Sequence, residues 1–204
     1  MIQEFLKGGG VMWMLLVCIV FGLAIVIERL FSLFVKIRLN PRVFHEQVRA
    51  QINEKGIPAG IELCARTSSP VAKILKSILE KSGEGKAAME EAMARSAVGE
   101  LAFLDRGMAL LAGLTTVAPF LGFLGTVTGM MRSFDAIAAA GEVEPTIVAS
   151  GIAEALITTK WGLLIATPLA IIHILFAGKI NSYTRDMEES GLELIDRLLS
   201  RDRK

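Results

Sequence analysis

The sequence predicts an all-α integral membrane protein, with three transmembrane helices and long helices that extend into a cytoplasmic helical bundle. Of its 204 residues 52% are hydrophobic and the mean hydropathy is +0.52, yet 21% of the residues are charged. These values are compatible only if the charges are segregated, and residues 8–27, 107–131 and 161–178 carry none. A helix needs roughly 20 apolar residues to cross a bilayer core, with about 17 as a lower limit. Three such segments predict three spans.

Residues 1–10 predict an outer amphipathic segment, and residues 11–28 predict the first span. This apolar stretch is longer than the roughly 7–15 residues of a signal-peptide core, and no small-residue cleavage site follows it. Glu28 and Arg29 come directly after it and close the helix at the cytoplasmic interface. We therefore interpret the stretch as a spanning helix.

Residues 29–106 predict a cytoplasmic helical domain. Pro41 and Pro70 stand where helices begin, because proline suits the first helical turn. The last helix begins near Lys86 and can continue straight into the second span. His45 is expected on the surface. Five apolar residues at helical spacing are expected in the bundle core: Val71, Ile74, Leu75, Ile78 and Leu79.

Residues 107–134 and 148–178 predict the second and third spans, joined by a periplasmic loop at 135–147 and followed by a cytoplasmic C-terminal helix at 179–204. Positively charged loops stay in the cytoplasm, so the N-terminus is expected outside and the C-terminus inside. The charges behind this topology are Arg29, Lys36, Arg38, Arg42 and Arg49 after the first span, Lys179, Arg185, Arg197, Arg201, Arg203 and Lys204 after the third, and Arg132, Asp135, Glu142 and Glu144 between the second and third.

Small and hydroxyl residues recur every three or four positions in the last two spans, so each set follows one helical face. We call these sets the small-residue stripes. Such a face either packs closely on another helix or borders a polar path. The first stripe is Thr115, Pro119, Gly122, Thr126, Gly129 and Ser133, and the second is Ala155, Thr159, Gly162, Ala166 and Ala170.

The third span also contains two ionisable residues, Glu154 and Lys160. A charged group near the bilayer centre costs about 3 kcal/mol on insertion scales, so each is a candidate functional residue. The two lie about 120° apart around one helix and cannot pair on the same face. Either they meet across subunits or each finds another partner. Glu154 therefore has two open interpretations, a structural ion pair and direct proton handling.

The remaining candidates carry less chemistry. His173 lies four turns beyond Thr159 on about the same side, where it could accept a proton at the cytoplasmic exit or bond a neighbouring helix. The sequence contains no phosphate-binding loop, nucleophile elbow or metal-ligand spacing, so no enzyme activity, cofactor or metal site is predicted. Cys18 and Cys64 are expected far apart, and a net charge of +1 gives no argument for nucleic acid.

Three blocks carry a family resemblance. Residues 115–129 read TTVAPFLGFLGTVTG, residues 151–163 read GIAEALITTKWGL followed by ATP at 166–168, and the first span ends in IERL. In this order the blocks resemble the ExbB/TolQ/MotA proton-channel family, and the resemblance covers almost the whole chain. Three spans with a cytoplasmic domain between the first two resemble the ExbB and TolQ branch, because MotA-type proteins have four spans.

The resemblance implies a multi-pass protein of the bacterial inner membrane that assembles as a pentamer around a central pore. The pore is lined by the second and third spans and holds the single helices of an ExbD or TolR-type partner, each with an aspartate that takes up and releases protons. Proton flow drives rotation, and the work passes to a TonB or TolA-type protein for biopolymer transport. By motif, Thr126 and Thr159 correspond to the family's pore threonines and Glu154 to its membrane glutamate.

The expected proton path therefore combines Thr115, Thr126, Thr159 and Glu154. The stripes themselves carry no carboxylate, so a partner carboxylate is needed for a protonation switch. The expected pore-lining small residues are Pro119, Gly122, Gly129, Ala155, Gly162 and Ala166.

Lys160 departs from the family pattern, which has an apolar residue after the threonine pair. A cation beside the pore would lower the pKa of a nearby aspartate. Alternatively, Lys160 faces a subunit interface and pairs with Glu154 of a neighbour. The interface placement is favoured because Lys160 lies about 100° around the helix from Thr159.

Two other functions stay open at this stage. A non-conducting membrane scaffold would use the small-residue stripes only for packing, and a stator for gliding or surface motility would drive a different system. An intramembrane enzyme lacks a credible pair of base and nucleophile.

Overall fold

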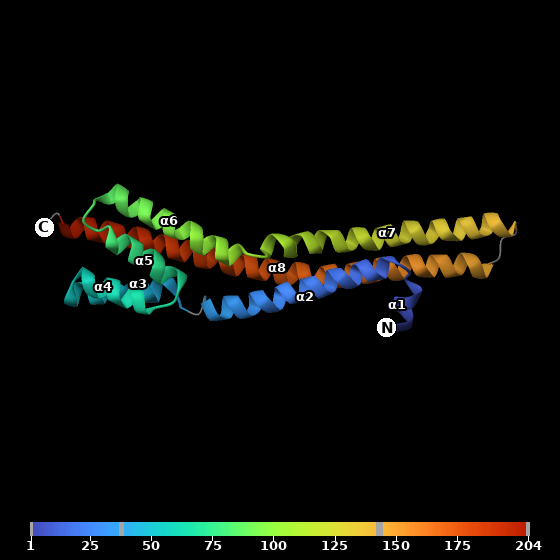
Figure 1. Cartoon of the computed structure of the whole chain (residues 1–204), viewed down its shortest axis with the longest axis horizontal. Helices are drawn as coiled ribbons and strands as arrows, with labels where there is room; N and C mark the ends of the chain where they lie inside the picture. The colour runs from blue at the N-terminus through green and yellow to red at the C-terminus, as the bar shows by residue number, and fades with distance from the viewer. Residues whose placement is uncertain (1, 37–38, 142–144, 203–204) are drawn as a thin grey trace. The chain divides into compact units, whose positions relative to one another are not determined.

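The computed structural model describes residues 2–36, 39–141 and 145–202, which form helices and contain no strand (Figure 1). The helices are α1 (Ile2–Lys7), α2 (Val11–Lys36), α3 (Pro41–Lys55), α4 (Ile57–Arg66), α5 (Pro70–Glu80), α6 (Lys86–Asp105), α7 (Met108–Ala140) and α8 (Pro145–Asp202). Five of the charges used to predict the topology, Arg38, Glu142, Glu144, Arg203 and Lys204, lie outside the described residues.

The helices divide into two compact units. The spanning unit comprises the chain up to residue 28 together with residues 107–175, and the bundle unit comprises residues 29–106 together with the chain from residue 176. Helices α2 and α8 contribute to both units, because each continues through the residue at which the chain is divided.

Three segments are long and apolar enough to cross a membrane, by length and composition, and they lie within Val11–Leu33, Lys86–Ala139 and Val148–Arg201. This confirms the all-α membrane fold with three spanning helices. Large apolar side chains point outward from the spanning unit, as expected of surfaces that meet lipid or neighbouring helices. They include Trp13, Phe21, Phe120, Phe123, Phe134, Leu156, Ile174 and Leu175.

The expected continuous helix from the bundle into the second span is wrong. Helix α6 ends at Asp105, Gly107 adopts a left-handed conformation with φ 77°, and α7 begins at Met108. Glycine reaches positive φ without a steric penalty, so a single glycine at this point is enough to separate two helices.

The connection between the second and third spans is shorter than the expected loop at 135–147. Helix α7 continues to Ala140, where Gly141 ends it with φ 69° and donates its backbone N–H to the Ile137 carbonyl at 3.1 Å. Helix α8 then begins at Pro145. The alanine-rich end of α7 explains the difference, because alanine has the highest helix propensity.

Within the bundle unit, α3, α4 and α5 pack against one another and α5 packs on α6 (Figure 1). The predicted core is confirmed, because all five expected residues of α5 are at most 2% exposed. Helix α8 joins this bundle through polar contacts. The Tyr183 and Ser69 hydroxyls lie 3.1 Å apart, and Arg42 of α3 pairs with Asp186 and Glu189 of α8.

Arg29 connects α2 with the end of α6 inside the bundle unit. Its side chain is fully buried, and its Nη1 donates to the Phe103 and Leu104 carbonyls, each at 3.1 Å. The guanidinium carbon also lies 5.7 Å from the centroid of the Phe103 ring. A cation at a helix C-terminus complements the negative end of the helix dipole and satisfies carbonyls that the helix leaves without partners.

Candidate functional site

The small-residue stripes of α7 and α8 face each other within one chain. A Cβ placed on Gly162 would lie 2.8 Å from the Ala118 carbonyl oxygen and 3.0 Å from the Gly122 Cα. A Cβ on Gly129 would lie 3.1 Å from the Ala155 nitrogen. Only glycine permits backbones to approach so closely, and close approach strengthens the van der Waals packing that holds helices together in lipid. Packing is therefore one role of the stripes.

This contact buries most of the small residues expected to line a pore. Gly122, Gly129, Ala155, Gly162 and Ala166 are buried, whereas Pro119 is partly exposed. Their place along a pore stays a prediction about the assembled protein. Within the single chain they determine how close α7 and α8 can come.

The three threonines of the expected proton path are partly exposed, at the margins of this buried contact. The Thr159 hydroxyl donates to the Gly122 carbonyl on α7 at 3.1 Å. The Thr126 hydroxyl donates to the Phe123 carbonyl at 2.6 Å, and that of Thr115 donates to Ala112 at 2.7 Å. Since Thr126 lies one turn beyond Gly122 on α7, the contact brings Thr159 to the part of α7 that carries Thr126.

Thr158 is a further residue of the contact that the sequence interpretation missed. It is 1% exposed, and its hydroxyl donates to the Ala155 carbonyl at 2.7 Å and to the Gly122 carbonyl at 3.3 Å. A Cβ on Gly125 would overlap the Thr158 side chain. Gly125 is not a member of the small-residue stripe of α7. A glycine beside the stripe could have indicated that a side chain of the facing helix, here Thr158, fills the space.

Glu154 forms an ion pair with Arg132, with 2.7 Å between Glu154 Oε1 and Arg132 Nη1. The turn before α2 lies over this pair, because a Cβ on Gly9 would overlap Glu154 Oε1 and come within 3.1 Å of Arg132 Nη1. The sequence indicated Arg132 only as a charge between the second and third spans. Of the two interpretations of Glu154, the structure contains the ion pair.

Within the single chain Lys160 pairs with Glu4 of α1. Its Nζ lies 3.1 Å and 3.3 Å from the two carboxylate oxygens of Glu4, and the Lys160 ammonium lowers the pKa of Glu4. Within the chain Glu154 is paired with Arg132, and the favoured pairing of Lys160 with a neighbour's Glu154 stays a prediction about the assembled protein. The carboxylate that pairs with Lys160 comes from α1, so the periodicity of the spans could not indicate it.

His173, the last candidate, is partly exposed on α8 and makes no hydrogen bond or ion pair with the residues that the structure describes. It lies apart from the threonine hydroxyls along α8, 14 residues beyond Thr159. The geometry therefore brings together Thr159 and the Thr126 segment of α7, and it leaves Glu154, Lys160 and His173 outside that contact.

Comparison with known sequences identifies the family. The MotA/TolQ/ExbB proton channel family matches residues 66–189, which include the stripes of both spans. The chain belongs to this family. A putative biopolymer transport protein ExbB homolog from Methanothermobacter thermautotrophicus is 30% identical over 202 residues, which cover 97% of this chain and 68% of that protein.

Two further relatives belong to the ExbB and TolQ branches of the MotA/TolQ/ExbB family. The biopolymer transport protein ExbB of Salmonella typhimurium is 39% identical over 107 residues, or 52% of this chain and 43% of that protein. The Tol-Pal system protein TolQ of Haemophilus influenzae is 36% identical over 87 residues, or 43% of this chain and 38% of that protein. The chain thus spans less than half the length of these two relatives.

Family membership and the three apolar helices together establish a multi-pass inner-membrane protein with a proton-channel, energy-transducing family role. His45, Arg29 and the α1 segment lie outside residues 66–189, the part of the chain that the family model matches.

Proposed function

We propose that this chain is the channel-forming stator subunit of an inner-membrane complex that uses the proton-motive force. The observation that supports this most directly is the position of the Thr126 and Thr159 hydroxyls. Both lie at the margin of the packed face, partly exposed within the chain, where a polar path between subunits could include them. Hydroxyl groups can hold water or accept a hydrogen bond from a protonated carboxyl group.

The chain does not supply the carboxylate for such a path. Glu154 is the only acidic residue within 107–134 and 148–178, and its charge is paired with Arg132. We therefore propose an ExbD or TolR-type partner, whose single transmembrane helix brings the aspartate that is protonated and deprotonated. The wild-type assembly is proposed to be a homopentamer around that helix, with a TonB or TolA-type protein receiving the work at the outer membrane.

The proposed orientation follows the positively charged segments, with the N-terminus in the periplasm and the C-terminus in the cytoplasm. The segment boundaries proposed from the sequence are kept for the spans, with the two changes at Gly107 and at residues 135–147 described above.

The test is proton flux in liposomes that contain this chain and its single-span partner. Thr126→Val and Thr159→Val each remove one hydroxyl at the expected path. Loss of one hydrogen bond costs about 0.5–1.5 kcal/mol, so each substitution should slow flux by up to roughly tenfold while the complex still assembles. Thr128→Val and Thr167→Val are matched controls, because those hydroxyls donate to carbonyls of their own helices on other faces.

A non-conducting scaffold is the second candidate, and the mutual burial of the small residues favours it. That function predicts no flux above background from the wild-type complex. Full flux in Thr159→Val would also contradict the proposed path. A pH-sensitive dye inside the liposomes measures both outcomes.

A further inference from the structure

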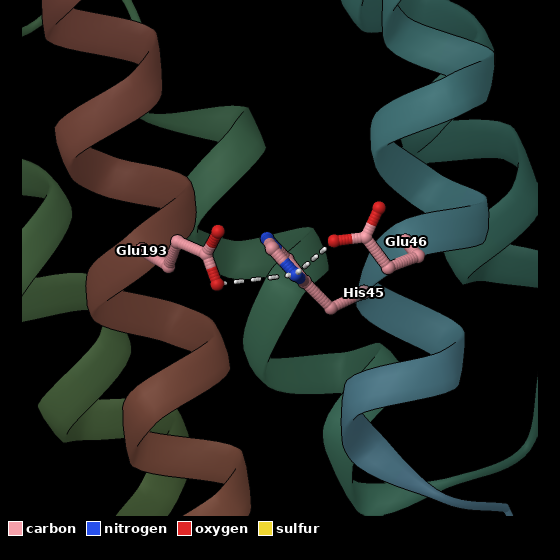
Figure 2. Close-up of side chains that lie close together, drawn as sticks. All are labelled: His45, Glu46 and Glu193. Carbon is pink, nitrogen blue, oxygen red and sulfur yellow. Dashed lines mark ion pairs between the residues drawn. The ribbon is translucent and has the colours of Figure 1, made fainter.

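His45 is buried in the bundle unit, although the sequence interpretation expected it on the surface. It lies on α3 and is 2% exposed, and its Nδ1 faces two carboxylates. Figure 2 shows the imidazole between Glu46, which comes from α3, and Glu193, which comes from α8. The prediction was wrong because His45 lies inside the bundle unit, beside Glu193 of α8, which is distant from α3 in the sequence.

Neither ring nitrogen of His45 makes a hydrogen bond to a described residue. Nε2 is buried without a partner. Nδ1 lies 3.7 Å from Glu193 Oε2 and 4.0 Å from Glu46 Oε1, beyond the roughly 2.7–3.2 Å of a hydrogen bond. Buried polar nitrogens are almost always hydrogen-bonded, so Nδ1, which faces two carboxylates without a hydrogen bond to either, calls for an explanation.

The separations suit a shared cation better than a direct bond. Metal–nitrogen and metal–oxygen bonds of about 2.0–2.2 Å place two ligands of one tetrahedral ion roughly 3.3–3.6 Å apart. The three ligand atoms here all lie within 4.8 Å of one another. The Glu46 and Glu193 side chains are 59% and 48% exposed, so small rotations can bring them onto an ion while His45 stays fixed.

We propose that His45, Glu46 and Glu193 form a divalent transition-metal site of the Zn²⁺ class that joins α3 to α8. One imidazole nitrogen and two carboxylates suit Zn²⁺, and water would complete the coordination. Mg²⁺ and Ca²⁺ prefer sites made of oxygen alone. The proposal does not depend on proton conduction, and all three residues lie outside the residues matched by the family.

The electrostatic surroundings are compatible with such a site. Burial lowers the pKa of His45, with smaller opposing effects from Glu193 and Glu46. Arg197 approaches Oε1 of Glu193 at 3.6 Å, which leaves Oε2 directed at His45. Arg49 binds both oxygens of Glu46, at 2.9 Å and 3.0 Å, and so competes with an ion.

This difference ranks the two carboxylates. Glu193 presents an oxygen that Arg197 does not use, whereas Glu46 must give up a contact with Arg49 before it can bind metal. Glu193 is therefore the stronger ligand, and its loss should weaken binding more than the loss of Glu46.

The test is a calorimetric titration of the full-length, tag-free protein in detergent, stripped with chelator and titrated with Zn²⁺. We expect one Zn²⁺ per chain. Because loss even of an outer-shell partner costs about 10–100-fold in metal affinity, His45→Gln and Glu193→Gln should weaken binding at least tenfold. His173→Gln, which changes the only other histidine, and Glu188→Gln, which changes an exposed glutamate of α8, should bind as the wild type does.

A thermal melt with and without Zn²⁺ provides a second readout. Zn²⁺ should raise the melting temperature of the wild type and of Glu188→Gln, and raise that of Glu193→Gln by less, because an ion that binds only the folded state stabilises it in proportion to its affinity. Glu193 is exposed, so its variant remains informative if His45→Gln fails to fold. Absence of Zn²⁺ binding by the wild type at millimolar concentration, unchanged binding by Glu193→Gln, or loss of binding in His173→Gln would each overturn the proposal.

Discussion

Gly162 offers the sharpest test of the α7–α8 contact. In Gly162→Ala the new methyl group would lie 2.8 Å from the Ala118 carbonyl oxygen and 3.0 Å from the Gly122 Cα. The first distance is short of ordinary van der Waals contact, 3.4 Å, by about 0.6 Å. Both neighbours are backbone atoms that no rotamer change can move, so the two helices must separate locally.

The cost follows from two effects. Overpacking a close contact costs about 1–3 kcal/mol. Separation also lengthens the 3.1 Å hydrogen bond from Thr159 to Gly122, and such bonds between membrane helices contribute about 0.6 kcal/mol on average. We expect Gly162→Ala to reduce the free energy of unfolding by about 2 kcal/mol, or roughly thirtyfold in the unfolding equilibrium.

Denaturant-induced unfolding in detergent, followed by tryptophan fluorescence, measures this change. Gly113→Ala is the matched control on α7, since a Cβ there meets no atom within 4 Å and should be neutral or stabilising by up to about 1 kcal/mol. Gly122→Ala should also destabilise, and the double variant with Gly162→Ala should cost less than the sum, because one separation relieves both contacts. If Gly162→Ala unfolded at the same denaturant concentration as Gly113→Ala, the close approach of α7 and α8 would be refuted.

Three further predictions concern charged and reactive groups. Burial lowers the His45 pKa below its ordinary 6.5, so just below pH 6.5 the unfolded chain binds a proton that the folded chain does not. Without metal, the free energy of unfolding should therefore fall as pH drops through 6.5. Denaturant unfolding at a series of pH values measures this slope, which His45→Gln should lose. Burial raises the pKa of Cys64 to about 12, so at pH 8 native Cys64 should resist iodoacetamide and react only on unfolding, as mass spectrometry would detect; rapid labelling of the native protein would contradict its burial. Arg132→Gln should destabilise by about 1–3 kcal/mol because it leaves Glu154 without its cation, and Glu154→Gln in the same chain should recover part of the loss; strict additivity in that double-mutant cycle would argue against the ion pair.

The spanning helices and the stripes could be predicted because they depend on local properties of the chain. A bilayer requires a minimum apolar length, and helical periodicity assigns Gly122 and Gly162 to one face each without knowledge of a partner. The sequence indicated that these faces could pack against another helix. Periodicity alone does not show whether that helix belongs to the same chain or to another subunit.

The contacts that the sequence did not indicate join residues that are far apart in the chain. Glu4 reaches Lys160 across 156 positions, and Arg132 reaches Glu154 across 22. His45 is buried and lies 3.7 Å from Glu193 of α8, which is far from it in the sequence. The break at Gly107 was missed for another reason, since isolated glycines also occur inside helices, as Gly113 does in α7.

The buried Arg29 clamp has a consequence for the order in which the chain matures. Its hydrogen-bond acceptors, the Phe103 and Leu104 carbonyls, lie 74 and 75 residues downstream, so the guanidinium cannot reach them while the ribosome is still making the intervening segment. Until then the charged Arg29 side chain must lie in water or among lipid headgroups at the end of the first inserted helix. Arg29 can therefore bind these carbonyls only after the segment between the first and second spans has been synthesised.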